Sequence, residues 1–405
     1  MGRVSPGAGP TESQPSGPDL GPAADGQANV IAATPGSTEW WRRLRDRLFA
    51  SPRFQARAAA FPLTRPIARR NARSLFDLCA GFVYSQVLAA CISLDLFVRL
   101  AAGPQTSEQL ASQSSMPAAG MERLLKAAVA LGLLQRRQGG RYGLGPHGAA
   151  LLGNPGIAAM VAHHDRLYRD LADPVALLRG ERGDGALGDY WPYATADAPS
   201  ALGADAVARY SALMAASLPF VANEVLAGFP FRRFRHLLDV GGGEGRFVEM
   251  VGARYAHLQL GLVDLPAVTE RARTRLAGTG LSARLHLHPA DMVRDPLPAG
   301  ADLISLIRIL HDHDDDSVRA ILARVRDALA PGGTVLIAEP MAGTRDAEPV
   351  GDAYFGMYLW AMGQGRARTP AELKAMLAQA GLVRPRLRAT RMPLLARMLE
   401  ARKPA

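Results

Sequence analysis

The stretch HLLDVGGGEGRF, residues 236–247, decides the fold of this 405-residue chain. An apolar run containing Leu237, Leu238 and Val240 leads into three consecutive glycines, and helical spacing begins at Phe247. The run is too short for a helix, so the pattern predicts a buried parallel strand followed by a tight turn and a helix. These three elements in this order predict a nucleotide-binding pocket.

The turn also indicates which nucleotide is bound. A dinucleotide fingerprint, G-x-G-x-x-G, places a pyrophosphate on bare backbone N–H groups, but here Gly241 and Gly243 are followed by Arg246 at the third glycine position. The carboxylates of Asp239 and Glu244 in the same turn would repel a pyrophosphate but attract an ammonium and a sulfonium. We therefore expect S-adenosylmethionine as the cofactor, with Asp239, Gly241 and Gly243 among its contacts.

Two later strands end in residues that suit the same ligand. The stretch QLGLVD ends at Asp264, where folds of this kind place a carboxylate against ribose hydroxyls. The stretch ARLHLHPA is followed by Asp291, an acceptor for the adenine amine, and by Met292, a soft side chain that can lie on the adenine ring. A glycine turn alone also fits an ordinary strand-to-helix loop, but three such signals in order favour the cofactor site.

The composition narrows the class of protein. With 48% hydrophobic residues, the chain can form two domains with full cores. Its net charge of +10 comes almost wholly from arginines spread among alanine, glycine and proline, which does not favour a nucleic-acid partner. Cys79 and Cys91 lack ligand spacing, and the N-terminus has no apolar signal core. We therefore expect a cytoplasmic protein without a disulfide or a metal.

Three regions follow one another along the chain. Residues 1–37, rich in Gly, Pro, Ser and Ala, predict a disordered tail. Residues 38–202 predict an all-helical, winged-helix-like domain. Residues 203–405 alternate strands with helices and predict an α/β fold with a parallel, doubly wound, Rossmann-like sheet.

The segment 40–73 is basic and amphipathic, with Trp40 and Trp41 at its start. Aromatic rings beside arginines suit the interface of a membrane, so one interpretation is peripheral contact with the cytoplasmic membrane face. The other interpretation is a helix that packs on its own domain and exposes a basic face.

The helical region contains a winged-helix pattern. Residues 74–100 predict one unbroken, buried apolar helix and not a membrane span. Residues 106–148 then predict two short capped helices and two short strands around a Gly-Gly pair. The candidate recognition helix, 117–131, offers only Arg123 and Lys126, which favours packing or dimerisation over DNA binding. A winged-helix regulator that binds a nucleotide-like ligand is the alternative from another class.

The fourth strand of the sheet, ADLISLIRIL, runs into HDHDDD, residues 311–316. A histidine at the carboxyl end of a parallel sheet lies beside the cofactor crevice, so we expect His311 to be the general base for a hydroxyl acceptor in an in-line methyl transfer. A metal site at residues 311–314 is one alternative, but four consecutive side chains cannot converge on one ion. Helix capping by the acids at 314–316 is another.

Six motifs in order resemble the caffeic-acid type of S-adenosylmethionine-dependent O-methyltransferases: LLDVGGGEGRF, GLVDLP, ADM, LIRILHD, PGG with LIAEP, and GRARTPAEL. The resemblance runs from about residue 75 to the C-terminus. It implies a winged-helix dimerisation domain, and hence a homodimer, before a class I Rossmann-like methyltransferase domain. The stretches from RDRLFASPRFQ to LFDLCAGFVYSQVLAACISLDLF are similar to the hydroxyneurosporene O-methyltransferases of purple photosynthetic bacteria, which methylate the 1-hydroxyl of acyclic carotenoids.

The resemblance also implies roles for individual residues. His311 matches the family's general base, and Glu339 matches an acid that orients it. Arg308 matches a basic cofactor contact, whereas Tyr210 and Met214 match an aromatic residue and a methionine that line the acceptor pocket. The implied acceptor is a hydroxycarotenoid of carotenoid biosynthesis, with a phenolic or polyketide hydroxyl as the alternative.

One position departs from the family pattern. The second acid that orients the histidine precedes Arg-Thr in a GRERT-like motif, whereas this chain reads GRART and has Ala367 in that place. Loss of this carboxylate lowers the basicity of His311 and makes the pocket less polar. The change fits an aliphatic alcohol on a long hydrocarbon, and it fits weakened catalysis equally.

Overall fold

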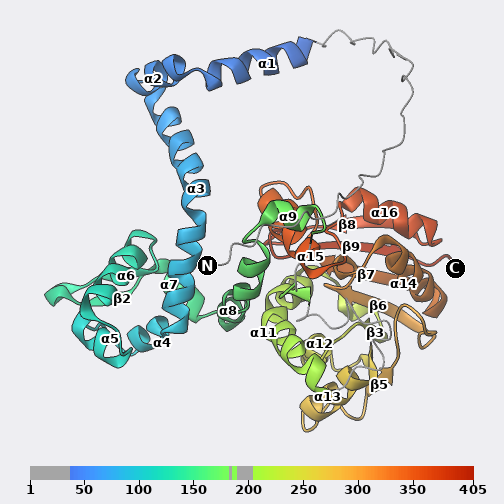
Figure 1. The fold of residues 1–405 in the computed structure, drawn as a ribbon. Coiled ribbons are helices and arrows are strands. Elements are labelled where there is room, and N and C mark those ends of the chain that lie inside the picture. The colour runs from blue at the N-terminus through green and yellow to red at the C-terminus, as the bar shows by residue number, and fades with distance from the viewer. Residues whose placement is uncertain (1–36, 182–184, 189–203) are drawn as a thin grey trace, which may run out of the picture. The chain divides into compact units, whose positions relative to one another are not determined.

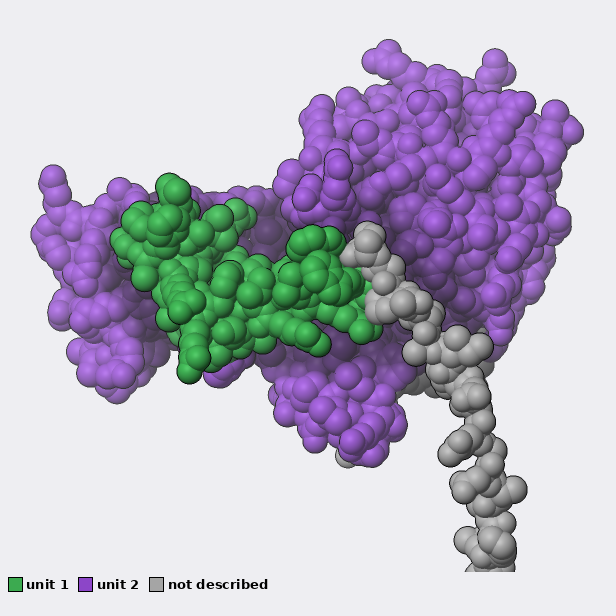
Figure 2. All heavy atoms as spheres, turned by 90° about the horizontal axis from the view of Figure 1, so that it is seen from above, with its two compact units in different colours: residues 1–80 green, residues 81–405 purple. Residues whose placement is uncertain are grey.

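The computed structural model describes residues 37–181, 185–188 and 204–405. The chain divides into two compact units, residues 1–80 and 81–405, which Figure 2 colours separately. The predicted tail, apart from Ser37, lies outside the described residues, as does the predicted domain boundary at 202–203. The predicted domain limits therefore stay predictions.

The first unit consists of short helices joined by defined corners. Helix α1 spans Ser37–Ala50, α2 spans Pro52–Ala60, and α3, Arg65–Ser93, begins in this unit. Ser51 caps α2 by accepting a hydrogen bond from the Phe54 N–H. None of the side chains of α2, all of which are described, is buried in the single chain.

The prediction of one unbroken, buried helix over residues 74–100 is wrong. Helix α3 ends at Ser93 because Asp95 adopts a left-handed φ of 53°, after which α4, Leu96–Ala101, begins. Most of α3 is exposed in the single chain. By length and composition, α3 and residues 211–228 would also pass as membrane spans, a test that core helices pass too.

The winged-helix pattern is confirmed in the second unit. Helices α5, Ser107–Gln113, and α6, Ala118–Ala130, precede the antiparallel strands β1, Leu134–Arg136, and β2, Tyr142–Leu144. A capping box at Thr106 starts α5. The turn η1, Gln138–Gly140, forms the wing between the strands. The helices α7 (Pro146–Leu152), α8 (Pro155–Asp170) and α9 (Pro174–Leu178) follow.

The rest of the second unit is built on a seven-stranded sheet in the order β5-β4-β3-β6-β7-β9-β8. The strands are β3 (His236–Val240), β4 (Gln259–Asp264), β5 (Leu285–Pro289), β6 (Ala301–Ile307), β7 (Leu329–Glu339), β8 (Val383–Arg388) and β9 (Arg397–Arg402). The first five in the sheet order are parallel, which confirms the α/β, Rossmann-like prediction. The sheet is mixed, however, because β9 is antiparallel to both β7 and β8. The short β8–β9 connection permits only antiparallel pairing.

Helices cover both faces of the sheet (Figure 1). Successive side chains of a strand point to opposite faces, so Leu237 packs toward one layer of helices and Leu238 toward the other. The first layer contains α11 (Ala204–Gly228) and α12 (Arg246–Arg254), and the second contains α14 (Asp315–Ala328) and α16 (Pro370–Gln379). The remaining elements are α13 (Pro266–Leu276), α15 (Gly356–Met362), a π-helical turn at Pro349–Phe355, and short turns at Phe231–Arg233 and Leu310–Asp312.

Candidate active site

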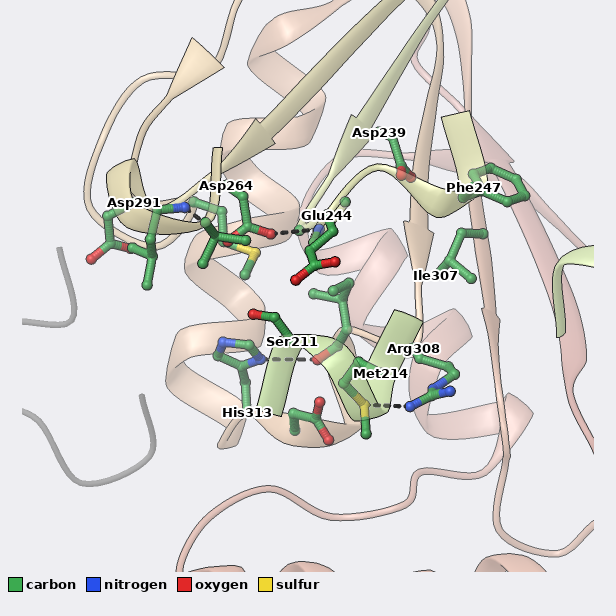
Figure 3. A pocket seen from close by; sticks show the side chains of 18 of the residues that line it. Ser211, Met214, Asp239, Glu244, Phe247, Asp264, Asp291, Ile307, Arg308 and His313 are labelled. Atoms are coloured by element: carbon green, nitrogen blue, oxygen red, sulfur yellow. Dashed lines mark hydrogen bonds between the residues drawn. The ribbon is translucent and has the colours of Figure 1, made fainter. Parts of the chain in front are cut away.

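A cavity of about 290 Å³ lies at the carboxyl ends of the parallel strands (Figure 3). Parallel strands deliver their carboxyl ends to one edge of the sheet, which is where open α/β folds bind ligands. The structure brings eight of the sequence-predicted residues together in the lining of this cavity: Met214, Asp239, Gly241, Gly243, Asp264, Asp291, Met292 and Arg308. Of the other three predicted residues, His311 and Glu339 lie nearby, and the side chain of Tyr210 is outside the described part.

The glycine turn begins at a position that has no room for a side chain. Gly241 has a φ of +70°, and a Cβ there would collide with the side chain of Ile309. The N–H of Gly243 donates a 2.8 Å hydrogen bond to Oδ2 of Asp264, which joins the turn after β3 to the end of β4. The turn is therefore tied to the Asp264 side chain through its own backbone N–H.

Asp239 offers an unpaired carboxylate oxygen to the cavity. Its Oδ1 accepts a 2.5 Å hydrogen bond from the Ser305 hydroxyl, whereas its Oδ2 is buried and has no hydrogen-bond partner. Burial raises the pKa of Asp239 to about 7, although the Ser305 hydrogen bond acts in the opposite direction. A buried acceptor without a donor is costly unless a ligand supplies one. A cationic ligand with N–H donors fits this site.

Asp264 stands where the sequence predicts a ribose contact. It accepts hydrogen bonds of 2.8 Å from the N–H groups of Gly243 and Leu265. Burial raises its pKa to about 6, against the effect of these two bonds. Each carboxylate oxygen retains a second lone pair for a hydroxyl donor.

The adenine end of the predicted site is formed by Asp291 and Met292. Asp291 is buried, and its Oδ1 accepts a 2.9 Å hydrogen bond from the Val293 N–H. Its carboxylate therefore also shapes the loop after β5. Met292 lies over the glycine turn, since its Cε is 3.4 Å from where a Cβ of Gly241 would be.

Glu244 does not act as the free carboxylate that its position in the turn suggested. It forms an ion pair with Arg271 of α13, with the Arg271 Nε 2.9 Å from its Oε1. The arginine neutralises its charge, so the attraction for a cation depends on Asp239 and Asp264. The pairing joins residues that are 27 positions apart, which no local pattern indicates.

The opposite wall joins Arg308 to helix α11. Arg308 follows β6 in a left-handed conformation, with a φ of 59°, which is uncommon outside glycine. Its Nη1 donates a 2.8 Å hydrogen bond to the hydroxyl of Ser217, and its Nη2 contacts the sulfur of Met214. The predicted cofactor contact and the predicted acceptor-pocket methionine therefore touch each other.

His311 is buried in the turn after β6, and it is not part of the cavity lining. Its Nε2 lies 3.0 Å from Oδ1 of Asp312, and its ring stacks on Phe355 with 5.5 Å between the ring centres. Burial lowers the pKa of His311, but the charges of Asp312 and Glu339 outweigh it and raise this pKa above its ordinary value. The lining instead includes Asp312 and His313, which the sequence pattern indicates only as members of the alternative metal site.

Glu339 holds the histidine through its backbone. Its Oε2 accepts a 3.2 Å hydrogen bond from the His311 N–H. Its Oε1 and the Nδ1 of His311 are both buried without a hydrogen-bond partner. One is an acceptor and the other can be a donor, so the two atoms are chemically complementary.

Arg368 was missed by the sequence reasoning. It is fully buried, and its guanidinium donates to the Leu310 carbonyl at 2.7 Å and the His313 carbonyl at 2.9 Å, on either side of His311. It also binds Asp315, at the start of α14, at 2.6 Å. The GRART motif that drew attention to Ala367 contained this arginine, but nothing in the motif indicates burial.

We call the contacts of Arg368 with the backbone on either side of His311 the clasp. Neighbouring residues complete it. Gly365, with a φ of +83°, lies so close to the backbone of Asp312 that a Cβ would be 2.7 Å from its carbonyl carbon. Hydrogen bonds from Arg366 and Arg368 lower the pKa of Asp315 to about 2, against the effect of burial. Asp314 caps α14 by accepting a 2.7 Å hydrogen bond from Ser317, as the capping alternative predicted.

Two parts of the chain match known protein families. Residues 76–154 match the O-methyltransferase dimerisation domain. Residues 168–383, more than half of the chain, match the O-methyltransferase domain.

Two similar bacterial relatives are demethylspheroidene O-methyltransferases. The chain is 44% identical to that of Cereibacter sphaeroides over 339 residues, which covers 84% of this chain and 89% of the relative. It is 37% identical to that of Rhodobacter capsulatus over 391 residues, 96% of each chain. The structure of human N-acetylserotonin methyltransferase in complex with S-adenosylmethionine has a TM-score of 0.69 at 24% identity, covers 83% of this chain and 98% of its own, and so supports the fold.

Proposed function

Because the chain belongs to the S-adenosylmethionine-dependent O-methyltransferases, we propose that it methylates the hydroxyl group of an acyclic hydroxycarotenoid in carotenoid biosynthesis. The observation that carries this proposal is the 44% identity to a demethylspheroidene O-methyltransferase across 84% of the chain. Membership of this enzyme family favours a methyltransferase over the regulator alternative. The dimerisation domain suggests a homodimer.

The residues of the cavity fit the cofactor. S-adenosylmethionine supplies a methyl group on a positively charged sulfur, which is already a good leaving group. Asp239 and Asp264 provide negative charge beside the glycine turn, and their raised pKa values are lowered again when a cation binds. Their role is to bind and orient the cofactor so that its methyl group faces the acceptor side.

We assign the proton transfer to His311. The unpartnered Nδ1 of His311 and Oε1 of Glu339 favour a working geometry in which Nδ1–H donates to Glu339. The imidazole then leaves Asp312, and its unprotonated Nε2 accepts the proton of the acceptor hydroxyl. The acceptor oxygen would take the methyl group as the methyl–sulfur bond breaks, which would leave a neutral thioether. A base can be out of reach before the substrate binds, so the present distance from the cavity does not exclude this role.

The acceptor side is suited to a hydrocarbon. Met214 belongs to an apolar cluster with Leu359, Met362 and Phe355, and Phe355 covers the ring of His311. The family pattern has two acids that orient the histidine, and Ala367 replaces one of them here. Of these two, Glu339 alone is left to orient the base. An apolar wall of this kind suits the hydrocarbon part of an aliphatic alcohol.

The test is incubation of the purified enzyme with labelled S-adenosylmethionine and a panel of acceptors. We expect label in hydroxycarotenoids with a tertiary 1-hydroxyl, and at least about a hundredfold slower labelling with His311→Ala. The panel includes phenols and naphthols of similar solubility, dispersed in the same detergent. Transfer to these phenols without transfer to any hydroxycarotenoid would contradict the proposed acceptor.

We also propose a cytoplasmic location at the membrane surface. A hydroxycarotenoid is nearly insoluble in water and dissolves in the bilayer, so an enzyme that acts on it works where membrane and cytoplasm meet. Fractionation of cells into soluble, peripheral and integral membrane proteins tests this location. Recovery only in the fraction that needs detergent for extraction would contradict it.

A further inference from the structure

The segment of residues 37–73, which we call the arm, concentrates positive charge. It contains ten arginines and two acidic residues, Glu39 and Asp46, which gives it a net charge of +8. The whole chain has a net charge of +10. The arm therefore carries a large share of the positive charge of the molecule, with residues 383–403, at a net charge of +6, as a second basic stretch, and it precedes the region 76–154 that matches the dimerisation domain.

The arm also exposes aromatic side chains. Trp40 and Trp41 are 54% and 62% exposed, and their rings pack edge to face with 4.5 Å between the ring centres. At helical spacing, Trp40, Leu44 and Leu48 follow one another on one side of α1, with Trp41 beside them. Phe49 and Phe54, 6.0 Å apart, extend this apolar surface around the corner into α2.

Arginines flank the apolar surface. Arg45 and Arg47 lie at its two edges on α1, where long side chains can hold their charges in water while their stems cover apolar groups. Both are exposed. Aromatic rings in the middle and cations at the edges are the pattern of a helix that lies in the interface of a bilayer.

The corners of the arm are built by specific hydrogen bonds. The amide of Gln55 donates to the Phe49 carbonyl at 2.6 Å, across the α1–α2 corner. The hydroxyl of Thr64 donates to the Ala58 carbonyl at 2.7 Å, and Arg65 donates to the Ala60 carbonyl at 2.8 Å, across the α2–α3 corner. The exposed aromatic surface therefore belongs to a defined element.

We infer that the arm docks the enzyme on an anionic lipid bilayer, with the aromatic face of α1 and α2 in the interface and the arginines against lipid headgroups. Charge complementarity selects this partner, because eight net positive charges favour a surface of anionic lipids. Docking would bring the enzyme to an acceptor dissolved in the membrane, and in this purpose it rests on the proposed function. Docking itself can be measured without any acceptor.

The experiment uses the full chain and vesicles of phosphatidylcholine with or without phosphatidylglycerol. The wild-type enzyme should sediment with the anionic vesicles and much less with the neutral ones. In the variant W40S/W41S/F49S, binding should fall at least tenfold. In R42Q/R43Q/R47Q, each lost charge should weaken binding about fivefold, and added salt should weaken the wild type in the same way.

Matched controls change similar residues outside the arm. Three exposed apolar residues of the second unit serve for the aromatic variant, and three exposed arginines serve for the charge variant. The apolar controls are Val383→Ser, Met392→Ser and Leu394→Ser, and the charge controls are Arg273→Gln, Arg319→Gln and Arg345→Gln. Both control triples should bind vesicles as the wild type does.

Two further measurements distinguish the outcomes. The aromatic variant should keep the wild-type oligomeric state and its turnover of a detergent-solubilised acceptor, but lose turnover of acceptor in vesicles. The inference is overturned if the aromatic variant binds vesicles as well as the wild type does, or if the wild type binds neutral vesicles equally well. It is also overturned if the variant becomes monomeric, because the arm would then pack on a second copy. If every hydroxycarotenoid fails as an acceptor while vesicle binding follows the predicted order, the proposed function fails and docking stands.

Discussion

The candidate active site has a cofactor half and a base half, which are held in place by different kinds of contact. In the cofactor half, residues 239–245, 264 and 291–292, the carboxylates are fixed by backbone N–H groups and one hydroxyl at the ends of neighbouring strands. In the base half, residues 308–315, 339 and 365–368, the turn around His311 is fixed by buried charged side chains from distant parts of the chain. The first half is therefore a property of the sheet, and the second depends on a few individual contacts.

This difference predicts where substitutions act. Changes in the cofactor half should alter binding of S-adenosylmethionine and leave the chemical step intact. Changes in the base half should do the reverse. The largest expected effect belongs to the base itself.

His311→Ala should lower kcat by about two to four orders of magnitude, the usual range for a positioned general base. The side chain does not line the cavity, so affinity for S-adenosylmethionine should stay near that of the wild type. Single-turnover transfer measures the first quantity and calorimetry the second. The neighbouring variant His313→Ala is the control, because His313 lines the cavity and the one described hydrogen bond of its ring goes to the Ile309 carbonyl. Wild-type turnover by His311→Ala would remove this residue from the mechanism.

Glu339→Gln should cost less than loss of His311. The amide oxygen can still accept from the His311 N–H, but the amide NH2 cannot accept from Nδ1–H, and the negative charge that adds to that of Asp312 in raising the pKa of the imidazole is lost. The pH profile of kcat should therefore shift to lower pH. A loss as large as that of His311→Ala would mean that Glu339 does more than orient the base.

Arg368→Gln tests whether the base half depends on the clasp. Removal of a fully buried guanidinium leaves the Leu310 and His313 carbonyls without a donor, so we expect a loss of about 3–5 kcal/mol in the free energy of unfolding. Because the turn loosens, kcat should fall about tenfold or more and its pH profile should shift, with little change in the Kd of S-adenosylmethionine. Denaturant unfolding and calorimetry measure these quantities.

Arg366→Gln is the matched control for the clasp. Arg366 is exposed and binds the same Asp315, but it donates to neither carbonyl beside His311 among the described hydrogen bonds. Its loss should cost about 1 kcal/mol or less. Equal effects of the two substitutions would show that Asp315 matters and that the contacts of Arg368 to the turn do not.

Sequence reasoning could identify the cofactor half because its signals are local. The glycine turn at Gly241 and the strand end at Asp264 are each readable from a few adjacent residues, and parallel pairing then brings them together. The clasp is not readable in this way, because Arg368 lies 55 positions from His313 and only packing shows that it is buried. For the same reason, the sequence indicated His311 and Glu339 as partners but not that Nε2 of His311 is bonded to Asp312.

Asp264→Ala should act on the cofactor half alone. Its carboxylate would accept the ribose hydroxyls, so its loss should weaken S-adenosylmethionine binding by about 1.5–3 kcal/mol, as for hydrogen bonds to a charged group. It also ties the glycine turn to β4 through the Gly243 N–H, so a small loss of stability is expected. Transfer measured at saturating cofactor should be nearly normal. Unaltered affinity in calorimetry would contradict the assignment of β4 to the ribose.

A pH dependence also belongs to the cofactor half. Burial raises the pKa of Asp239 to about 7 and that of Asp264 to about 6 in the free protein, from a reference of 3.8. A cationic ligand favours the ionised carboxylates, so binding releases protons at a pH below these values. Affinity for S-adenosylmethionine should therefore rise with pH up to about pH 7, by at most about tenfold per pH unit for each carboxylate.

The same two groups act on stability with the opposite sign. A carboxyl whose pKa is higher in the folded than in the unfolded protein stabilises the fold below its unfolded pKa, and this contribution is lost as the pH rises through the folded value. The free enzyme should thus lose stability from these groups between about pH 4 and pH 7, while the stabilisation by added S-adenosylmethionine grows. Asp239→Asn should remove the changes in affinity and in stability near pH 7, which Asp239 causes. The changes near pH 6, which Asp264 causes, should remain. Calorimetry and thermal unfolding at a series of pH values measure the two curves, and an affinity that stays constant from about pH 5 to pH 8 would mean that neither carboxylate meets the positive charge of the cofactor.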